Sequence, residues 1–469
     1  KQEIEALKAQ MAELKNAQAK LNVDALKAQV SEIKAHDAGD NIKWTVDFRT
    51  AYDYVDYKVQ GGVAQVPDGA GGFTPTNVNG GSPHNSIWTN KLILGMASQP
   101  VDNLIFKGSL AAYKTYGQSY DQSGMFQNFD WYGSQKPNDS AIRLREAYFL
   151  YMGNMGDVPY TASFGRRPSV DGFLANLRND NENPASPISH NINMEFDGAS
   201  FKLDMDKVTG ISGMYLKLCL GRGFSNTTGA YSSNGAGGFN PAYINDDKNP
   251  DMDLVGLVAQ LYDNGQYKAM FNYFLGFNMM GINPTSPTQD FMDVGDLTGG
   301  ALSFQVNGIG DGISDFLDDT TFFASFAWSQ TDPNNASKNL LLPPTYSFMK
   351  GMLGSTEKET GTSYYIGTQM PGVMKGQRLG LEYNHGSKYW RSFTYGEDTL
   401  VGSKLAARGD AYEIYYILPL VGKNLTAQLS YIYIDYDYTG SDTFFGMTGI
   451  PMDVDATPGA VKTAQNLRA

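Results

Sequence analysis

The stretch of sequence that decides the fold class is residues 42–58, IKWTVDFRTAYDYVDYK. Nearly every second residue is apolar or aromatic, beginning with Ile42, Trp44 and Val46, and the residues between them are mostly polar or charged. Successive side chains of an extended strand point to opposite faces, so this period of two predicts a strand with one apolar and one polar face. The segment is about twice as long as an ordinary strand, and its apolar face ends in tyrosines.

The same alternation recurs along the chain between segments rich in Gly, Asn and Asp. This pattern is typical of an outer-membrane β-barrel, in which apolar side chains face lipid, polar side chains line the lumen and aromatic girdles lie at the interfaces. The composition agrees, with 41% hydrophobic and 13% aromatic residues and a mean hydropathy of −0.35. No apolar run approaches the ~18 residues of a membrane-spanning helix. We predict an all-β transmembrane barrel, with a large soluble β protein as the alternative.

Charge and cysteine content exclude several classes of site. The net charge of −13 argues against nucleic-acid binding, but it does not set the sign of a pore, because charges in loops and in a lumen act separately. Cys219 is the only cysteine, so the chain has no intrachain disulfide and no cysteine-based metal cluster. Lys1 opens directly on a helical pattern, and we interpret the chain as mature, with its leader removed.

The first 36 residues predict a helical arm made of two copies of one sequence, residues 3–16 and 22–35, offset by nineteen residues. Both copies are rich in helix-forming residues and have apolar side chains three and four positions apart, which indicates a coiled-coil seam. The seam residues are Ile4, Leu7, Met11, Leu14, Val23, Leu26, Val30 and Ile33. Each copy is too short to be stable alone, so we expect self-association. The alternative is an amphipathic helix folded back on the barrel. Residues 37–41 form a linker.

About sixteen segments have the strand pattern, an even number as bacterial barrels require. They are residues 42–59, 86–98, 104–116, 141–153, 159–167, 195–206, 212–223, 252–263, 266–279, 298–308, 320–330, 376–385, 389–397, 409–418, 424–437 and 462–469. The weakest assignment lies within residues 386–408, and fourteen strands is the alternative. Short and long gaps alternate, as short periplasmic turns and long external loops do. Strand one leads into a long loop, so the helical arm is expected in the periplasm.

Two resemblances follow from these segments. The strand pattern resembles the general diffusion porins. Residues 22–58 and 378–390 resemble an uncharacterised porin family of epsilon-class proteobacteria with an N-terminal coiled coil. Both imply an outer-membrane pore in residues 42–469. Outer-membrane barrels resemble one another in ending on an aromatic residue, whereas this chain ends KTAQNLRA, so we expect further C-terminal residues.

Charged residues at lumen-facing positions predict a constriction. In the general porins the third external loop folds into the barrel with its carboxylates facing a basic wall, and residues 168–194 are similar to that loop. The expected basic wall is Arg49, Lys107, Arg143, Arg145, Arg166 and Arg167, and the expected loop carboxylates are Asp171, Asp180 and Glu182. Charged rings of this kind are a common selectivity device. Alternatively, Arg166 and Arg167 are solvated or bind lipopolysaccharide phosphates from outside.

The function expected from these features is passive diffusion of small hydrophilic solutes or ions through a homotrimeric porin in outer-membrane lipid and lipopolysaccharide. The alternative is a structural anchor whose coiled coil binds peptidoglycan or a periplasmic protein. We expect no enzyme, because the four histidines form no recognisable catalytic constellation with neighbouring residues. We expect no cofactor or bound metal, with Ca²⁺ in the acidic external loops as the alternative. The aspartates concerned are Asp246, Asp247, Asp251, Asp253, Asp290, Asp293 and Asp296.

Overall fold

The computed structural model describes most of the barrel and a few residues of the arm. The described residues are 5, 8, 11, 29–33, 42–67, 73–116, 142–167, 169–181, 184–225, 227, 232, 233, 238–240, 242, 243, 251–282, 291–310, 312–335, 352–441 and 450–469. Among these residues, no helix is long and apolar enough to cross a membrane.

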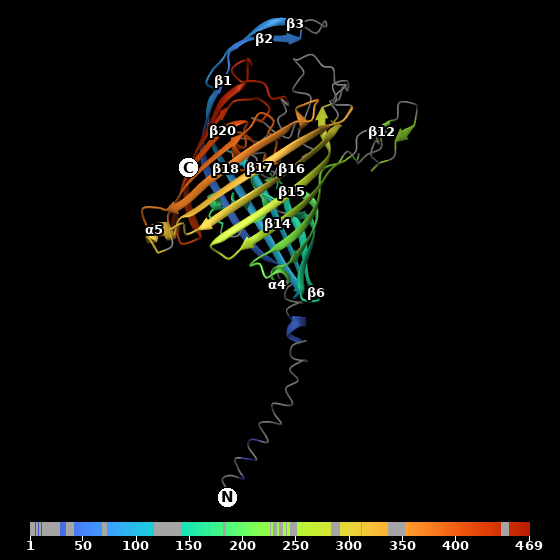
Figure 1. Cartoon of the computed structure of the whole chain (residues 1–469), viewed down its shortest axis with the longest axis vertical. Coiled ribbons are helices and arrows are strands. Elements are labelled where there is room, and N and C mark those ends of the chain that lie inside the picture. Colours follow the sequence, from blue (N-terminus) through green and yellow to red (C-terminus); the bar gives the residue numbers. More distant parts are fainter. Residues whose placement is uncertain are drawn as a thin grey trace.

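Sixteen antiparallel strands form one closed barrel (Figure 1). Each strand pairs with its neighbours in chain order, and the last strand pairs with the first. The strands are β1 (Lys43–Val59), β4 (His84–Val101), β5 (Leu104–Thr115), β6 (Arg143–Met155), β7 (Val158–Arg167), β10 (Phe196–Asp204), β11 (Tyr215–Phe224), β14 (Met252–Asp263), β15 (Tyr267–Ile282), β16 (Phe291–Asn307), β17 (Thr321–Pro333), β18 (Thr360–Pro371), β19 (Arg378–Gly386), β20 (Gly409–Val421), β21 (Leu425–Tyr436) and β22 (Val461–Arg468).

Shorter elements occupy the connections. The hairpins β2 (Gly62–Pro67) with β3 (Phe73–Val78) and β12 (Ser232–Ser233) with β13 (Phe239–Asn240) lie outside the barrel sheet. Short helical turns, α4 (Asp206–Thr209) and α5 (Asp315–Asp318), join strands at the other end (Figure 1). Lys43 at the start of β1 pairs with Ala97 near the short turn after β4, so the arm joins the barrel at the end with the short turns.

Alternation in β1 agrees with the prediction from residues 42–58. Trp44, Val46 and Phe48 are exposed on the outer face, whereas Ala51 and Asp53 on the other face are buried. Around the outer face of β18 to β21, tyrosine rings form a continuous row, since the centroid of Tyr383 lies 6.2 Å from that of Tyr364 and 5.1 Å from that of Tyr412. The apolar outer face and its tyrosines match the belt and girdle of a membrane barrel.

The predicted count of sixteen is right, although one predicted strand is wrong and one strand was missed. Residues 389–397 are a loop buried inside the barrel, where Phe393 and Tyr395 imitate the period of two of a strand. The missed strand is β18, which lies in the gap between the predicted strands 320–330 and 376–385. Its alternation is hidden because the neighbours Tyr364 and Tyr365 are both aromatic and point to opposite faces.

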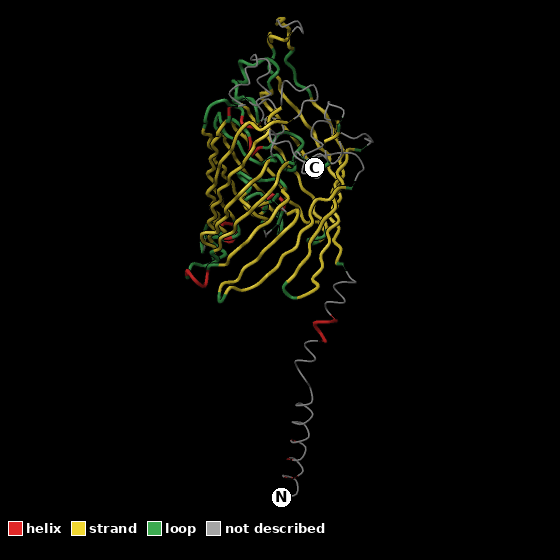
Figure 2. The backbone as a smooth tube through the Cα atoms, turned by 90° about the vertical axis from the view of Figure 1, so that its right-hand side faces the viewer, coloured by secondary structure: helices red, strands yellow, loops and turns green. Residues whose placement is uncertain are grey.

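The closing ladder joins β22 to β1 and β21. Asp53 lies opposite Arg468 and Val59 opposite Val461, while Ser430 of β21 lies opposite the same Arg468. In Figure 2 the chain ends part of the way along the barrel wall, where the backbone of Tyr52 exchanges hydrogen bonds of 2.9 Å with Ala469.

Few residues of the predicted arm are described. Residues 5, 8, 11 and 29–33 are helical, and the side chains of Met11, Val30 and Ile33 are exposed. The other seam positions lie outside the described residues: Ile4, Leu7, Leu14, Val23 and Leu26. The coiled coil therefore stays a prediction.

Candidate pore constriction

The connection between β7 and β10 folds into the barrel, and we call residues 169–195 the first inserted loop. It contains β8 (Gly172–Phe173), the 3-10 turn η2 (Leu177–Asn179) and β9 (Ala185–Ile188). Phe173, Leu174 and Ile188 are completely buried in a cluster with inner-face residues such as Phe323 and Ala301. The loop therefore packs on the inner face of β14 to β18 instead of extending into solvent.

Neutral hydrogen bonds hold the first inserted loop against these strands. The ring of His190 bonds to the hydroxyls of Ser325 and Ser363, at 2.8 and 2.9 Å. Asn272 on β15 donates its side-chain amide to the Asn191 side chain, at 2.9 Å. Burial lowers the pKa of His190 to about 3, so the ring is neutral near pH 7. His190 bonds to these strand hydroxyls, while the hydroxyl of Ser189 donates to Phe173 O at 2.8 Å, and the role of His190 in this geometry is to position the loop.

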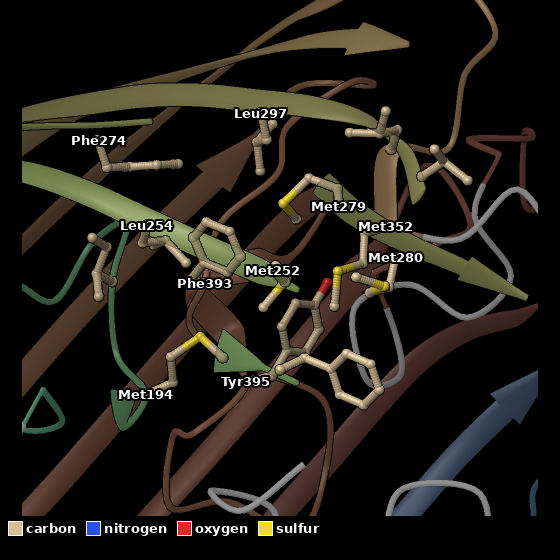
Figure 3. Packing of buried hydrophobic residues seen from close by; sticks show 14 of the residues in the cluster. Met194, Met252, Leu254, Phe274, Met279, Met280, Leu297, Met352, Phe393 and Tyr395 are labelled. Carbon is tan, nitrogen blue, oxygen red and sulfur yellow. The ribbon is translucent and has the colours of Figure 1, made fainter. Parts of the chain in front are cut away.

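The connection between β19 and β20 also folds inward, and we call residues 387–408 the second inserted loop. It includes the 3-10 turn η4 (Lys404–Ala406). Phe393 forms a parallel bridge with Ile192, its N–H donates to Asn191 O at 2.9 Å, and its carbonyl accepts from Asn193 N–H at 2.6 Å. Figure 3 shows Phe393 and Tyr395 packed among Met194, Met252 and Phe274. The two inserted loops thus form one connected body inside the barrel.

A buried charge cluster joins both loops to the wall. Arg178 of the first inserted loop lies 2.5 Å from Glu397 of the second, and 3.7 Å from Glu413 on β20. Lys404 pairs with Glu413 and with Glu382 on β19. Burial alone raises the pKa of Glu397, but the positive charges of Arg178 and Lys404 outweigh it and hold this pKa below its usual value. Glu397 therefore stays ionised beside these cations, in a cluster that holds three carboxylates and two cations.

A second charge cluster lies further along the wall, around Asp398 of the second inserted loop. Arg49 on β1 donates to both carboxylate oxygens of Asp398, at 2.8 and 3.1 Å. Lys91 on β4 donates at 2.8 Å and Arg468 on β22 at 3.3 Å. Burial opposes ionisation of Asp398, but the three cations outweigh it and hold its pKa well below the usual range. Asp398 thus joins the second loop to the first strands of the barrel.

The predicted pairing between wall and loop is present at one point. Arg145 on β6 donates to Glu195 at 3.2 Å, and another of its nitrogens lies 3.8 Å from Asp171 of the first inserted loop. Asp180 instead lies 3.0 Å from Arg378 on β19. Glu182 lies outside the described residues. Of the predicted cations, Arg49 faces the second inserted loop and not the first.

The remaining predicted cations divide between the two faces of the wall. Lys107, Arg143 and Arg167 occupy inner-face positions by alternation. Arg166 shares the face of the exposed Phe164, and its guanidinium lies 3.6 Å from Asp197. Neighbouring residues of one strand cannot both face the lumen, so Arg166 belongs to the outer side of the wall.

Two of the aspartates for which Ca²⁺ was the alternative prediction, Asp251 and Asp253, pair with an arginine. Arg222 lies 2.5 Å from Asp251 and 2.8 Å from Asp253. Asp293 accepts from the Gly295 N–H at 2.8 Å. Asp246, Asp247 and Asp290 lie outside the described residues. Within the described part of the chain, no group of three or more His, Cys, Asp or Glu side chains is arranged to hold a metal ion.

Sequence reasoning missed the second inserted loop and its carboxylates Glu397 and Asp398. A signal was present: the stretch contains Trp390, Arg391 and the adjacent acids within a connection too apolar for an exposed loop. Reading Phe393 and Tyr395 as strand residues hid it. The length of 22 residues between β19 and β20 also matches an external loop and not a strand pair.

Comparisons with known proteins give one family and several solved structures. The family model described as "Protein of unknown function (DUF3373)" matches residues 82–469. None of the curated proteins compared with the chain matches it. The chain is similar to the anion-selective porin from Comamonas acidovorans (12% identity, 91% of this chain and 98% of that one, TM-score 0.41). It is also similar to Pseudomonas putida OprB at high pH (12% identity, 92% of this chain and 95% of that one, TM-score 0.44). A third similar structure is Salmonella typhi OmpF in complex with daunomycin (11% identity, 92% of this chain and 98% of that one, TM-score 0.41).

Proposed function

The chain belongs to the DUF3373 family of proteins of unknown function, and from its closed barrel and charged interior we propose that it is an outer-membrane porin. Small hydrophilic solutes or ions diffuse passively through its lumen. The observation that carries this proposal is the pair of inserted loops, which present carboxylates such as Asp171 and Asp398 toward cations such as Arg145 and Arg49.

The proposed constriction acts by width and by electric field. The two loops fill the lumen beside β14 to β20, because their buried side chains pack on those inner faces. The inner faces of β5 to β11 are left to bound the passage. Opposed charges across a narrow, water-filled space orient hydrated polar solutes. Apolar solutes gain no comparable stabilisation in that space.

The proposed membrane placement follows from the outer face. The exposed apolar residues of β1 and the tyrosine row over β18 to β21 lie in lipid and at its interface. The end of the barrel with the short turns faces the periplasm, and the arm extends from it. We propose a homotrimer with an arm that self-associates through its apolar seam, since the exposed Val30 and Ile33 need a partner.

Planar-bilayer recording of the purified full-length protein tests the proposed function. We expect large, steady conductance steps that are proportional to bulk salt, as diffusion through a water-filled lumen requires. A correctly assembled protein that inserts without conducting would overturn the porin proposal, and would favour the anchor role of the arm.

Deletion of residues 1–36 separates the arm from the pore. We expect the remaining barrel to keep the conductance of each pore, because no described contact of the inserted loops involves the arm. The oligomer is expected to dissociate at lower temperature than that of the full chain, measured by electrophoresis without boiling. A deletion variant with unchanged oligomer stability would show that the arm does not assemble the protein.

A further inference from the structure

The wall that bounds the proposed passage carries positive charge on several successive strands. Alternation places Lys107 of β5, Arg143 of β6, Arg167 of β7, Lys202 of β10 and Lys217 of β11 on the inner face. Lys202 lies directly opposite Lys217, and the charge of Arg167 also acts on Lys217. Like charges repel one another, so Arg167 and Lys217 together favour an anion between them, whereas Lys202 already has Asp204 beside it.

The loop carboxylates do not neutralise this wall. Asp398 is shared among three cations, while Glu195 and Asp171 face Arg145. Lys202 is paired with Asp204, at 2.6 Å.

Three cations of the wall remain. Within the described part of the chain, Lys107, Arg143 and Arg167 have no ion pair. The buried Nε of Arg143 and of Arg167 also has no hydrogen-bond partner among those residues. Among the described residues the carboxylates of both loops are already engaged, and Glu146 of β6 lies 3.9 Å from Arg145, so these residues leave the wall with a positive excess.

A cavity lies between this wall and the first inserted loop. Its volume is about 60 Å³, and its lining includes Arg167 and Lys217 from the wall, Ser169 from the loop and Asn272 from β15. This volume holds several water-sized groups. The guanidinium of Arg167 is suited to carboxylate or phosphate oxygens, which it binds with two parallel hydrogen bonds.

From this geometry we infer that the passage prefers small anions and that Arg167 and Lys217 form an anion-binding step within it. The inference rests on the proposed porin function and names its solute class: inorganic anions and small carboxylates or phosphates. Positive walls with low-dielectric backing raise the local anion concentration by roughly tenfold or more.

Reversal potentials in a KCl gradient test this inference with the full-length protein. We expect wild-type pores to conduct Cl⁻ about tenfold better than K⁺. The triple variant Lys107→Gln, Arg143→Gln, Arg167→Gln is expected to bring this ratio to about one. Lys358→Gln is the matched control, because Lys358 pairs with Asp332 at an exposed site outside the barrel interior, and it is expected to leave the ratio unchanged.

Inorganic phosphate provides a second readout that does not depend on the triple variant. Millimolar phosphate is expected to reduce the wild-type chloride current, and Arg167→Gln is expected to relieve that block several-fold. Conducting pores that prefer K⁺, or a phosphate block unchanged by Arg167→Gln, would overturn the anion inference and leave the porin proposal intact. Silent membranes would overturn the porin proposal itself.

Discussion

The two inserted loops occupy the same lumen but are held there by different forces. The first is held mainly by apolar packing and neutral hydrogen bonds, centred on Phe173 and on His190 between two serine hydroxyls, and Arg178 adds an ion pair with the second loop. The second is held by ion pairs at Glu397 and Asp398. Apolar packing and neutral bonds are insensitive to charge, whereas buried ion pairs depend on every partner being present. The difference teaches that the first loop is mainly a wedge packed on β14 to β18, whereas the second is an electrostatic bridge to β1, β4 and β22.

The largest expected effect comes from removing the charge at the centre of the bridge. Asp398→Asn leaves Arg49, Lys91 and Arg468 without their shared carboxylate. Breaking a buried pair by removing one partner costs about 3–5 kcal/mol, so the free energy of unfolding should fall by that order. Denaturant unfolding followed by tryptophan fluorescence measures it.

Asp398→Asn is also expected to change the current measured in planar bilayers. The freed cations should increase the anion preference and the current noise, because the second loop loses its contact with β1 and β4. Asp332→Asn, at an exposed pair with Lys358, is the control and should change stability by less than about 1 kcal/mol. Equal effects of the two substitutions would contradict the bridge.

A somewhat smaller loss of stability is expected from a substitution in the first inserted loop. His190→Ala leaves the Ser325 and Ser363 hydroxyls without the ring and opens a space beside Tyr365 and Trp390. A cavity and lost buried hydrogen bonds together cost about 2–4 kcal/mol. His84→Ala, at an exposed site, is the matched control. Stability equal to wild type would show that the first loop is not held by His190.

As pH falls, the stability contributed by the first inserted loop should be lost before that contributed by the second. His190 has a pKa lowered to about 3 in the folded protein, against about 6.5 when unfolded, so its contribution is complete above pH 6.5 and is lost as pH falls toward 3. By pH 5 the loss is about 2 kcal/mol. Asp398 has a depressed pKa, so its contribution is present above about pH 4 and is lost only as pH falls through the folded value.

Unfolding measured from pH 7 to pH 4 in wild type and His190→Gln checks this order. The substitution should remove most of the stability change between pH 6.5 and 4.5, since Gln does not titrate. A pH dependence of the same size in both proteins would contradict the assignment of the mild-acid transition to the first inserted loop.

The smallest effect is expected outside both loops. Arg222 pairs with Asp251 and Asp253 at a half-exposed site near the rim of the barrel. Exposed ion pairs contribute about 0–1 kcal/mol, so Arg222→Gln should leave stability and selectivity close to wild type. A loss as large as that of Asp398→Asn would show that ion pairs inside and outside the lumen do not differ in the way proposed.

The barrel could be predicted because alternation is a local signal. In strands such as β1 and β4, residues of the outer and inner faces alternate along the sequence. The alternation of short and long gaps gives the direction of each strand. The exception, β18, has aromatic residues on both faces because Tyr365 packs against the inserted loops, and the adjacent Tyr364 and Tyr365 interrupt the alternation. Where an inserted loop packs on the inner face of a strand, residues there are buried. The alternation of apolar and polar residues that is typical of a strand facing an open lumen is then hidden.

The site was harder to predict because a loop's partners are distant in sequence. The cations of the wall were predicted from strand parity, and by that parity Arg166 shares the face of Phe164. Asp180 was expected opposite the basic wall but lies beside Arg378, and Asp398 reaches Arg49 across 349 positions of chain. No local pattern encodes which connection turns inward, since that depends on packing against several strands at once.

Chemical modification of Cys219 tests the central claim most directly. This single cysteine lies on the inner face of β11, between Lys217 and the cavity beside Arg167. If solutes pass along this wall, a negatively charged thiol reagent should react there, lower the single-pore conductance and reduce the preference for Cl⁻, with Cys219→Ser unaffected. An unreactive Cys219, or a fully modified protein with wild-type current, would contradict a passage along the wall of β5 to β11.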